Sequence, residues 1–376
     1  MTRFVRIISL LMLGMLVLAC DPGTSATPED AAPVEWSLTE ILRLGTFAPE
    51  DAGPAQFGAI ASVAMDSENR VYVLDGQDQE IRVFRLSGEF SHSIGRPGSG
   101  PGEFEFARSM ALSPGDTLVV RDDGAMRYSV FAPGGDLLGT HRRDIVGTNG
   151  GARPEWVDGR YVDWAPATPD GRFGSRFQLL PIAFTPEFER ADSLAPIEHR
   201  WEMLPNDMPM TSYASAPLGA LSPNGDVWAA ESGVYAAHLR SPAGDTIRSV
   251  SLEVDALPVG PEEIASIEER FERSPEYLGH VLEALPAEQP PLALVTTDPA
   301  GRLYMFPNTS DRAFGTGFDV FSPDGEHVAS VDLPASDPVA FRDAERIRVY
   351  EDHIVLVRRD ALDVPYVVVY EIERSR

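Results

Sequence analysis

Six times along the chain a short polar turn leads into a short apolar strand. Each strand is preceded by residues such as Gly, Pro, Asn and Asp, which favour tight turns. The six copies are Asp66–Leu74, Ser113–Val120, Val157–Asp163, Ser222–Ala229, Asp298–Met305 and Tyr350–Val357. A repeat of this period in an all-β pattern is typical of a propeller or a β-solenoid. We therefore expect an all-β fold, a six-bladed β-propeller of four-stranded antiparallel blades.

A second set of tight turns recurs between the first set. In a propeller blade the first set would join strands one and two, and the second set would join strands three and four. Glycine suits these hairpins because it takes positive φ without steric cost. The second set is Leu86–Glu89, Ala132–Asp136, Ser241–Asp245 and Ser322–Glu326, with a degenerate Thr185–Phe188 in blade three.

The sixth blade is one strand short. Its third strand is expected at Val367–Ile372, and too little chain follows for a fourth. Residues 38–44, near the start of the chain, alternate apolar and polar in the manner of a strand. We predict that this N-terminal strand is the outer strand of the last blade, where it would close the ring and cover an exposed sheet edge.

The loops differ in length according to the face on which they would lie. Tight turns gather on one face, here called the tight-turn face. The opposite, long-loop face carries the second-to-third loops and the blade-to-blade connections, and it is expected to be the working surface because loops carry function more often than their scaffold. Its long segments are residues 95–104, 142–156, 165–176, 196–217, 259–291 and 307–317.

The longest of these segments has a helical pattern at residues 261–285. Ile264, Ile267 and Phe271 fall on one side of a first helix. A second helix is expected to open at Ser274, with an apolar stripe of Leu278, Val281, Leu282 and Leu285. Such a pair over the channel mouth would be a lid, a docking surface or simple packing on the propeller.

Charge narrows the class of partner. The net charge is −27, and all 31 basic residues are arginines. Nucleic acid and anionic membrane surfaces are therefore poor partners. Without lysine, Schiff-base chemistry and lysine-dependent phosphate loops are excluded.

The first residues have the pattern of an export signal. Arg3 and Arg6 precede an apolar run that ends at Cys20, the only cysteine, and the run is too short to span a membrane. Residues 17–20 resemble the lipobox of bacterial lipoproteins. That resemblance implies a signal peptide at 1–19, a lipid on Cys20 and a location at the cell envelope, outside the cytoplasm. Residues 20–35 are polar and proline-rich, as in a flexible tether, and 36–376 would form the propeller.

Blade one carries a family resemblance. The strands Val71–Asp75 and Ile81–Phe84 and the segment Ile94–Phe104, with its Gly-Ser-Gly-Pro-Gly-Glu-Phe run, are similar to the NHL repeat. Blade two keeps half of this pattern and the others keep less. The chain thus resembles six-bladed propeller lipoproteins of the NHL and gluconolactonase-like superfamily. This resemblance implies the fold; its members include scaffolds, ligand binders, lactonases and lyases.

For an enzyme, this resemblance implies metal chemistry. The resemblance implies, for a lactonase, a metal-binding glutamate on a first strand, but the expected first strand Gly58–Ala64 has none. The seven histidines show no spacing typical of zinc ligands. Asp75, Asp122 and Glu231 end equivalent second strands and are weak candidates for a divalent cation such as Ca²⁺. The alternative, which the repeat favours, is that these acids bind the loops of their own blades.

Four further residues are candidates for ligand binding because they would face the channel from first strands. They are Ser62, Arg108, Ser215 and Arg342. The two arginines would suit an anionic ligand, since guanidinium matches carboxylate and phosphate geometry. In so acidic a chain, neighbouring carboxylates are the competing partners.

Together these observations favour binding over catalysis. We expect an envelope-anchored propeller that acts as a binding or scaffold module, without a cofactor, for a protein, peptide or glycan on the long-loop face. The alternative is a metal-dependent lactonase, hydrolase or lyase of the gluconolactonase-like type.

Overall fold

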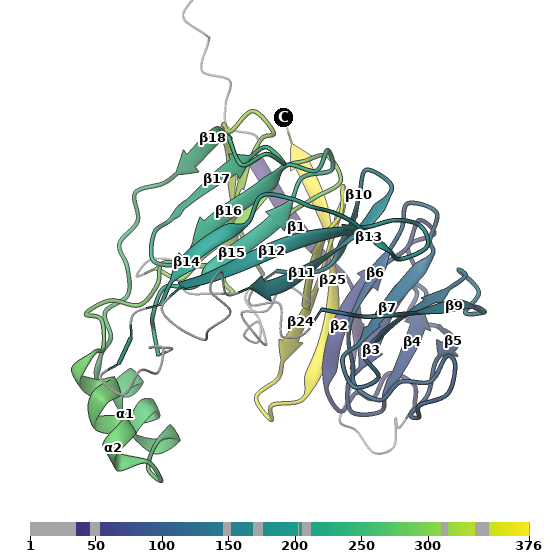
Figure 1. Ribbon diagram of the computed structural model, residues 1–376, viewed down its shortest axis with the longest axis horizontal. Helices are drawn as coiled ribbons and strands as arrows, with labels where there is room; N and C mark the ends of the chain where they lie inside the picture. Colours follow the sequence, from purple (N-terminus) through teal and green to yellow (C-terminus); the bar gives the residue numbers. More distant parts are fainter. Residues whose placement is uncertain are drawn as a thin grey trace, which may run out of the picture.

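The strands form six antiparallel sheets arranged in a ring (Figure 1). The computed structural model describes residues 35–45, 53–145, 152–167, 176–201, 203–204, 212–309, 315–334 and 346–375. The first-to-fourth strand order is consecutive in blades one, two, four and five, as predicted. Cys20 and Arg342 lie outside the described residues.

The strands of the first three blades are as follows. Blade one contains β2 (Ile60–Met65), β3 (Val71–Asp75), β4 (Glu80–Phe84) and β5 (Phe90–Ile94). Blade two contains β6 (Ala107–Leu112), β7 (Leu118–Asp122), β8 (Arg127–Phe131) and β9 (Leu137–Arg142). Blade three contains β10 (Glu155–Val157), β11 (Arg160–Ala167), β12 (Arg176–Phe184), β13 (Arg190–Ser193) and β14 (Ile197–Arg200).

The other three blades complete the ring. Blade four contains β15 (Pro217–Leu221), β16 (Val227–Glu231), β17 (Ala236–Arg240) and β18 (Thr246–Ser251). Blade five contains β19 (Leu292–Thr297), β20 (Leu303–Pro307), β21 (Gly317–Phe321) and β22 (His327–Asp332). Blade six contains β23 (Ile347–Val349), β24 (His353–Arg359), β25 (Pro365–Ser375) and, outermost, β1 (Glu35–Leu44).

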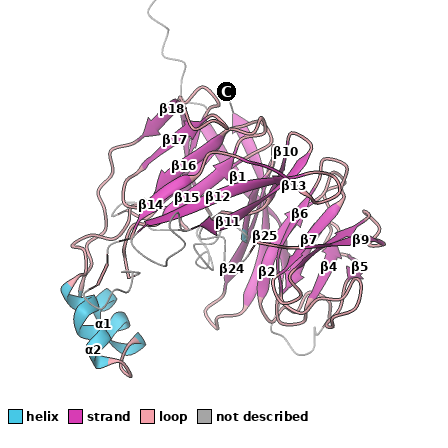
Figure 2. Cartoon of the chain, viewed as in Figure 1, coloured by secondary structure: helices cyan, strands magenta, loops and turns pink. Residues whose placement is uncertain are grey.

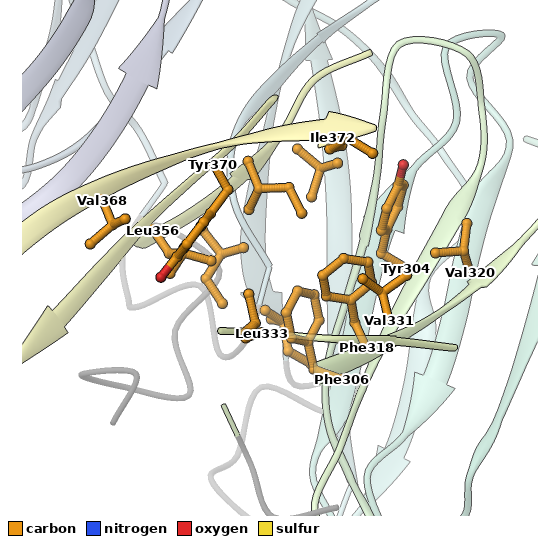
Figure 3. Close-up of a cluster of buried hydrophobic side chains, with 14 of the residues drawn as sticks. Tyr304, Phe306, Phe318, Val320, Val331, Leu333, Leu356, Val368, Tyr370 and Ile372 are labelled. Atoms are coloured by element: carbon orange, nitrogen blue, oxygen red, sulfur yellow. The ribbon is translucent and has the colours of Figure 1, made fainter. Parts of the chain in front are cut away.

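The core is divided among the interfaces between blades. Six apolar clusters each draw side chains from two consecutive blades, including the pair of blades six and one. Figure 3 shows the cluster between blades five and six, where Tyr304, Phe306 and Phe318 meet Leu356 and Val368. Each blade thus buries apolar side chains against both of its neighbours, so opening the ring at any interface would expose core side chains of two blades.

Two of the repeated turns, in blades one and five, are held by the same set of hydrogen bonds. Asp66 accepts hydrogen bonds from the backbone N–H of Arg70 (2.8 Å), from Nε of Arg70 (2.6 Å) and from the hydroxyl of Tyr72 (3.1 Å). Asp298 makes the same three bonds with Arg302 and Tyr304 in blade five. Burial, together with the neighbouring aspartate, raises the pKa of both tyrosines well above its usual range. In blades one and five the polar part of the repeat therefore holds the turn against the second strand.

The N-terminal strand closes the ring, as predicted, and starts earlier than predicted, at Glu35. It pairs antiparallel with β25, and its register shifts between Glu40 and Leu42. This bulge reverses which face the following side chains occupy. Trp36 and Leu38 therefore pack with the cluster between blades five and six, whereas Leu42 and Leu44 are buried between blades six and one. One strand thus seals two interfaces.

Blade three departs from the four-stranded prediction. Its third strand, β12, is nine residues long and pairs with two strands in succession. β13 pairs with the second half of β12, and β14 pairs with the first half, from Arg176 to Leu179. β14 then lies beside β15 of blade four. The outer position of this blade is thus split between two short strands.

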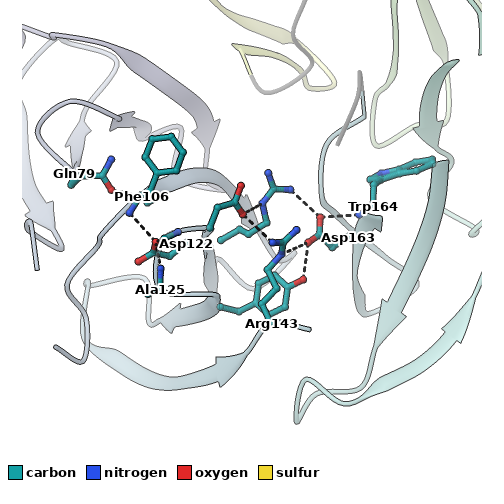
Figure 4. Close-up of polar contacts among 12 residues, drawn as sticks. Gln79, Phe106, Asp122, Ala125, Arg143, Asp163 and Trp164 are labelled. Carbon is teal, nitrogen blue, oxygen red and sulfur yellow. Dashed lines mark hydrogen bonds and ion pairs between the residues drawn. The ribbon is translucent and has the colours of Figure 1, made fainter. Parts of the chain in front are cut away.

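A buried ion network joins blades two and three. Asp163 accepts bonds from Arg121 (3.2 Å), Arg143 (3.5 Å), the Tyr128 hydroxyl (2.7 Å) and the backbone N–H of Trp164 (2.8 Å) (Figure 4). Burial and the adjacent Asp163 raise the pKa of Tyr128, so this hydroxyl remains a donor. The network is fully enclosed and serves to fix the two blades in register.

The helical insertion forms as predicted between blades four and five. It contains α1 (Pro261–Arg270) and α2 (Pro275–Glu283), the two helices of the described residues (Figure 2). Ile267 and Val281 are buried together with Leu204, from the connection between blades three and four. Figure 1 shows the pair projecting from the long-loop face, at the opposite end of the ring from the start of β1. Neither helix is long and apolar enough to cross a membrane.

Candidate ligand-binding site

Asp75 and Asp122, two of the weak metal candidates, are occupied by backbone amides. Asp122 accepts hydrogen bonds from the N–H groups of Glu105, Phe106, Gly124 and Ala125, at 2.9–3.1 Å (Figure 4). Asp75 makes the equivalent four bonds in blade one. Both side chains are fully buried. Each acid ties its own turn to the entry of its own first strand.

Glu231 occupies the equivalent position in blade four but has different partners. The hydroxyl of the next residue, Ser232, accepts a hydrogen bond from Ala216 N–H (2.8 Å). In blades one and two the equivalent backbone amide donates to the aspartate, so in blade four this amide has a different acceptor. Glu231 instead accepts from His199 Nδ1 (3.2 Å) and from the Ser215 hydroxyl (3.2 Å). Its side chain keeps 42% of its surface exposed. Blade four therefore presents a carboxylate to the long-loop face.

A charged hollow of about 360 Å³ surrounds this carboxylate. β12 supplies Arg176, Phe177 and Gln178, β14 supplies Glu198, His199 and Arg200, and β16 supplies Glu231. The split outer position of blade three is what brings β14 to this place. The strand ends concerned all lie at the long-loop face, since β12 begins and β16 ends there. We call this set of residues the charged hollow.

His199 and Glu231 form an ordered pair in the wall of the charged hollow. A carboxylate only accepts hydrogen bonds, so Nδ1 of His199 carries the shared proton. The hydrogen bond from His199 holds the pKa of Glu231 below its ordinary value, against the opposing effect of partial burial. The His199 side chain is 2% exposed, and its Nε2 atom has no hydrogen-bond partner.

An aromatic hollow of about 450 Å³ adjoins the charged one and shares Phe177 with it. The Trp201 ring lies 4.5 Å from the His199 ring and 6.1 Å from the Phe177 ring, centroid to centroid. Tyr213 lines the opposite part, and α1 contributes Ile267 and Arg270 to the rim. We call this set the aromatic hollow. A third hollow continues along the far side of blade four and shares Tyr213 and Ala214 with it.

A further hollow, of about 630 Å³, opens at the tight-turn face. It is lined by the ends of first strands from all six blades, among them Met65, Leu112 and Val349. Its charged residues are engaged locally: Asp66 with Arg70, Asp298 with Arg302 and Arg153 with Glu155. This hollow is the mouth of the central channel on the tight-turn face. It is the alternative location for a ligand-binding site.

The candidate residues on first strands are dispersed. Ser62 is fully buried in β2, and Arg108 lies over the Phe106 ring at 5.3 Å. Ser215 lies beside blade four, where it donates to Glu231 and accepts from Gly233 N–H (3.0 Å). The structure thus brings Ser215 and Glu231 together and keeps Ser62 and Arg108 apart from them.

The sequence prediction missed Arg176, His199, Arg200 and Trp201. For His199, Arg200 and Trp201 the signal was present in the run Glu198–Trp201, three charged or titratable residues and a tryptophan within a segment assigned to a loop. In the part of the chain that the structure describes, no three His, Cys, Asp or Glu side chains gather as metal ligands would.

Comparisons with known proteins bear on the fold. Residues 53–145, which form blades one and two, match the model of the DUF5128 family, described as a 6-bladed beta-propeller. No curated protein matches the chain.

Similar solved structures are distant in sequence. A member of the duf4221 family from Bacteroides vulgatus is 12% identical, covering 91% of this chain and 99% of that one, with a TM-score of 0.51. Virginiamycin B lyase from Staphylococcus aureus is 12% identical over 90% and 99%, with a TM-score of 0.41. A gluconolactonase from Xanthomonas campestris is 12% identical over 91% and 96%, with a TM-score of 0.42. At these identities the likeness concerns the fold alone.

Proposed function

We propose that this propeller is a binding module whose ligand occupies the long-loop face between blades three and four. The observation that carries the proposal is the convergence of three adjoining hollows around blade four, beside the helical insertion. Concave sites with an apolar lining and a few polar groups are the usual form of ligand sites. The partner class is a protein, peptide or glycan of the cell envelope.

The helical insertion supports the same surface. The two arms of its neck are joined to each other by the bonds Val259 N–H to Ala287 O (2.9 Å) and Gln289 N–H to Leu257 O (2.7 Å), and the Asn308 side chain, just after β20, donates to Pro290 O (3.1 Å). Its own apolar cluster includes Tyr213 and Ala214, which also line the aromatic hollow. A ligand in that hollow would therefore contact both the ring and the insertion.

Two matched substitutions of alanine by tryptophan test this location. Ala214→Trp would fill the aromatic hollow, and Ala243→Trp places the same bulk on the exposed third-to-fourth turn of blade four, on the tight-turn face. Arrays of oligosaccharides and peptides would be probed with the wild type and both variants. Loss of the wild-type signals in Ala214→Trp alone supports the proposal. Signals that survive in both variants, or vanish equally in both, contradict it.

Anchoring at the envelope is part of the proposal. It is supported by the lipobox-like residues 17–20 and by the start of β1 at the tight-turn face. A tether that enters the ring there would leave the long-loop face directed away from the bilayer. The lipid would be the chain's contact with the membrane.

The His199–Glu231 pair favours a second candidate, a hydrolase or lyase. The bond from Nδ1 to a carboxylate leaves Nε2 as the basic nitrogen, the arrangement of a general base. Assays would follow lactone hydrolysis and β-elimination with the wild type and a His199→Phe variant. Turnover that disappears in the folded variant supports catalysis, and turnover that persists there contradicts it.

A further inference from the structure

We propose that the partner is a basic peptide, which binds in the third hollow along the far side of blade four. This inference rests on the proposed function and names the chemistry of the ligand. The third hollow has a volume of about 720 Å³. Tyr213 and Ala214 line both this hollow and the aromatic hollow, so the two spaces adjoin on the same surface.

Carboxylates line the third hollow from two segments of the chain. Glu253 and Asp255 belong to the connection that follows β18, and Glu288 belongs to the chain that returns from α2 to β19. All three residues are exposed. None of them forms an ion pair or a side-chain hydrogen bond with a described residue, and no arginine or histidine is among the described residues that line the hollow. The hollow therefore has a negative rim without a counter-charge of its own.

This lack of a counter-charge is not general in the chain. At the mouth of the central channel, Asp66, Glu155 and Asp298 are each paired with an arginine. In the aromatic hollow, Arg270 of α1 lies at the rim. A concave site lined by one sign of charge concentrates ions of the opposite sign. Among the hollows around blade four, the third therefore favours a cationic ligand.

Apolar surface inside the rim favours a peptide over a small cation. Val234, at the turn between β16 and β17, is 55% exposed and lines this hollow. Leu252 and Val254 also line it, and they are only partly buried against the core cluster between blades four and five. A ligand with apolar side chains would cover this surface and remove it from water.

The acids are spaced along an extended segment and do not converge on one point. Exposed Glu253 and Asp255 alternate with half-buried Leu252 and Val254, as on a β-strand. Residues two apart on such a segment lie on the same side, about 6.5–7 Å apart. Within the described part of the chain, no three His, Cys, Asp or Glu side chains gather as ligands of one metal ion would. A peptide with basic residues at every second position matches this spacing, whereas a single divalent ion does not.

Isothermal titration of the full chain with matched probes tests the charge and the apolar part separately. The probes are the blocked pentapeptides Arg-Val-Arg-Val-Arg and Gln-Val-Gln-Val-Gln, with spermine as a cation that has no apolar side chains. We expect the basic peptide to bind at least about tenfold more tightly than the glutamine peptide, because each exposed ion pair contributes a factor of about two to five. It should also bind more tightly than spermine. Equal affinity for the two peptides, or for the basic peptide and spermine, overturns the proposal.

A triple variant then locates the bound peptide. Glu253→Gln, Asp255→Asn and Glu288→Gln together should weaken binding of the basic peptide by about tenfold or more. The substituted side chains are exposed, so the far-UV circular dichroism spectrum should remain that of the wild type. Unchanged affinity in this folded variant contradicts the site.

A matched control is needed because the whole chain has a net charge of −27. The control triple combines Glu187→Gln, Glu189→Gln and Asp245→Asn, and it has the same net charge as the first triple. It alters exposed acids in the third-to-fourth turns of blades three and four, on the tight-turn face. Binding should be unchanged. An equal loss in both triples shows a response to net charge alone and overturns the proposal.

These results separate the two proposals. If an array ligand is lost in Ala214→Trp but is indifferent to the substitution of Glu253, Asp255 and Glu288, the surface stands and the basic peptide is wrong. If no array ligand depends on Ala214 and the basic peptide does not bind, both are wrong.

Discussion

Asp122 and Glu231 end equivalent strands but have different roles, because the glutamate side chain is longer by one methylene group. Asp122 is buried under four backbone amides, whereas the longer Glu231 reaches His199 across the blade boundary. The repeat correctly predicted the structural alternative for the aspartates. Nothing in the pattern of one strand could predict His199, because its approach depends on how β14 pairs in another blade.

Matched amide substitutions should separate these roles. Asp122→Asn leaves amide donors facing an NH₂ group and should lower the free energy of unfolding by about 2–3 kcal/mol. Glu231→Gln, at a partly exposed side chain, should cost below about 1 kcal/mol. Urea unfolding followed by far-UV circular dichroism measures both. Equal losses in the two variants would show that Glu231 is also structural.

The hydrogen bond between His199 and Glu231 should contribute to the pH dependence of folding stability in acid. The folded-state pKa of Glu231 lies below its ordinary value of 4.5 because His199 donates to it. A depressed pKa adds stability that is fully present above about pH 4.5 and is lost as pH falls through the folded-state pKa. His199→Phe should therefore flatten this part of the stability–pH curve. An unchanged curve in the variant would contradict the interaction.

At the scale of elements, two segments that are both appended to the repeats differ in importance. β1 supplies apolar side chains to two blade interfaces, buried at one and partly buried at the other, whereas α1 and α2 bury their apolar stripes mainly against each other and the segment near Leu204. The alternation of residues 38–44 was enough to predict the strand. It could not predict the bulge, because a register shift depends on the partner strand β25.

Deletion should expose this difference. Removing residues 36–46 should abolish cooperative unfolding, because Leu42 and Leu44 leave one interface and Trp36 and Leu38 leave another. Replacing residues 261–285 by a short Gly–Ser linker should preserve the ring's unfolding transition. Differential scanning calorimetry compares the two proteins. A stable, cooperatively folding protein without β1 would refute its role as the closing strand.

The strand β14 was not predicted from the sequence. Its four residues lie in a segment assigned to a loop, and single-sequence patterns this short do not distinguish strand from loop. The strand forms because β12 is long enough to pair with two partners, so the signal lies in another element. The pairing of Arg176 with Arg200 in this register could not be predicted for the same reason.

At the scale of the whole molecule, the proposed anchor and the proposed site lie at opposite faces of the ring. If Cys20 carries the lipid, Cys20→Ala should release the protein from the membrane fraction while the ring remains folded. Mass spectrometry of the wild type should then find an acylated N-terminus at Cys20. An unmodified cysteine, or a Cys20→Ala variant that still sediments with membranes, would contradict lipid anchoring.

The central claim is that ligand binds between blades three and four and not at the channel mouth. Hydrogen–deuterium exchange with a saturating concentration of a ligand found on the oligosaccharide and peptide arrays tests it directly. We expect slower exchange in residues 176–200 and 212–235, with residues 64–67 and 111–116 unchanged. Protection confined to 64–67 and 111–116 would place the site at the tight-turn face and contradict the account.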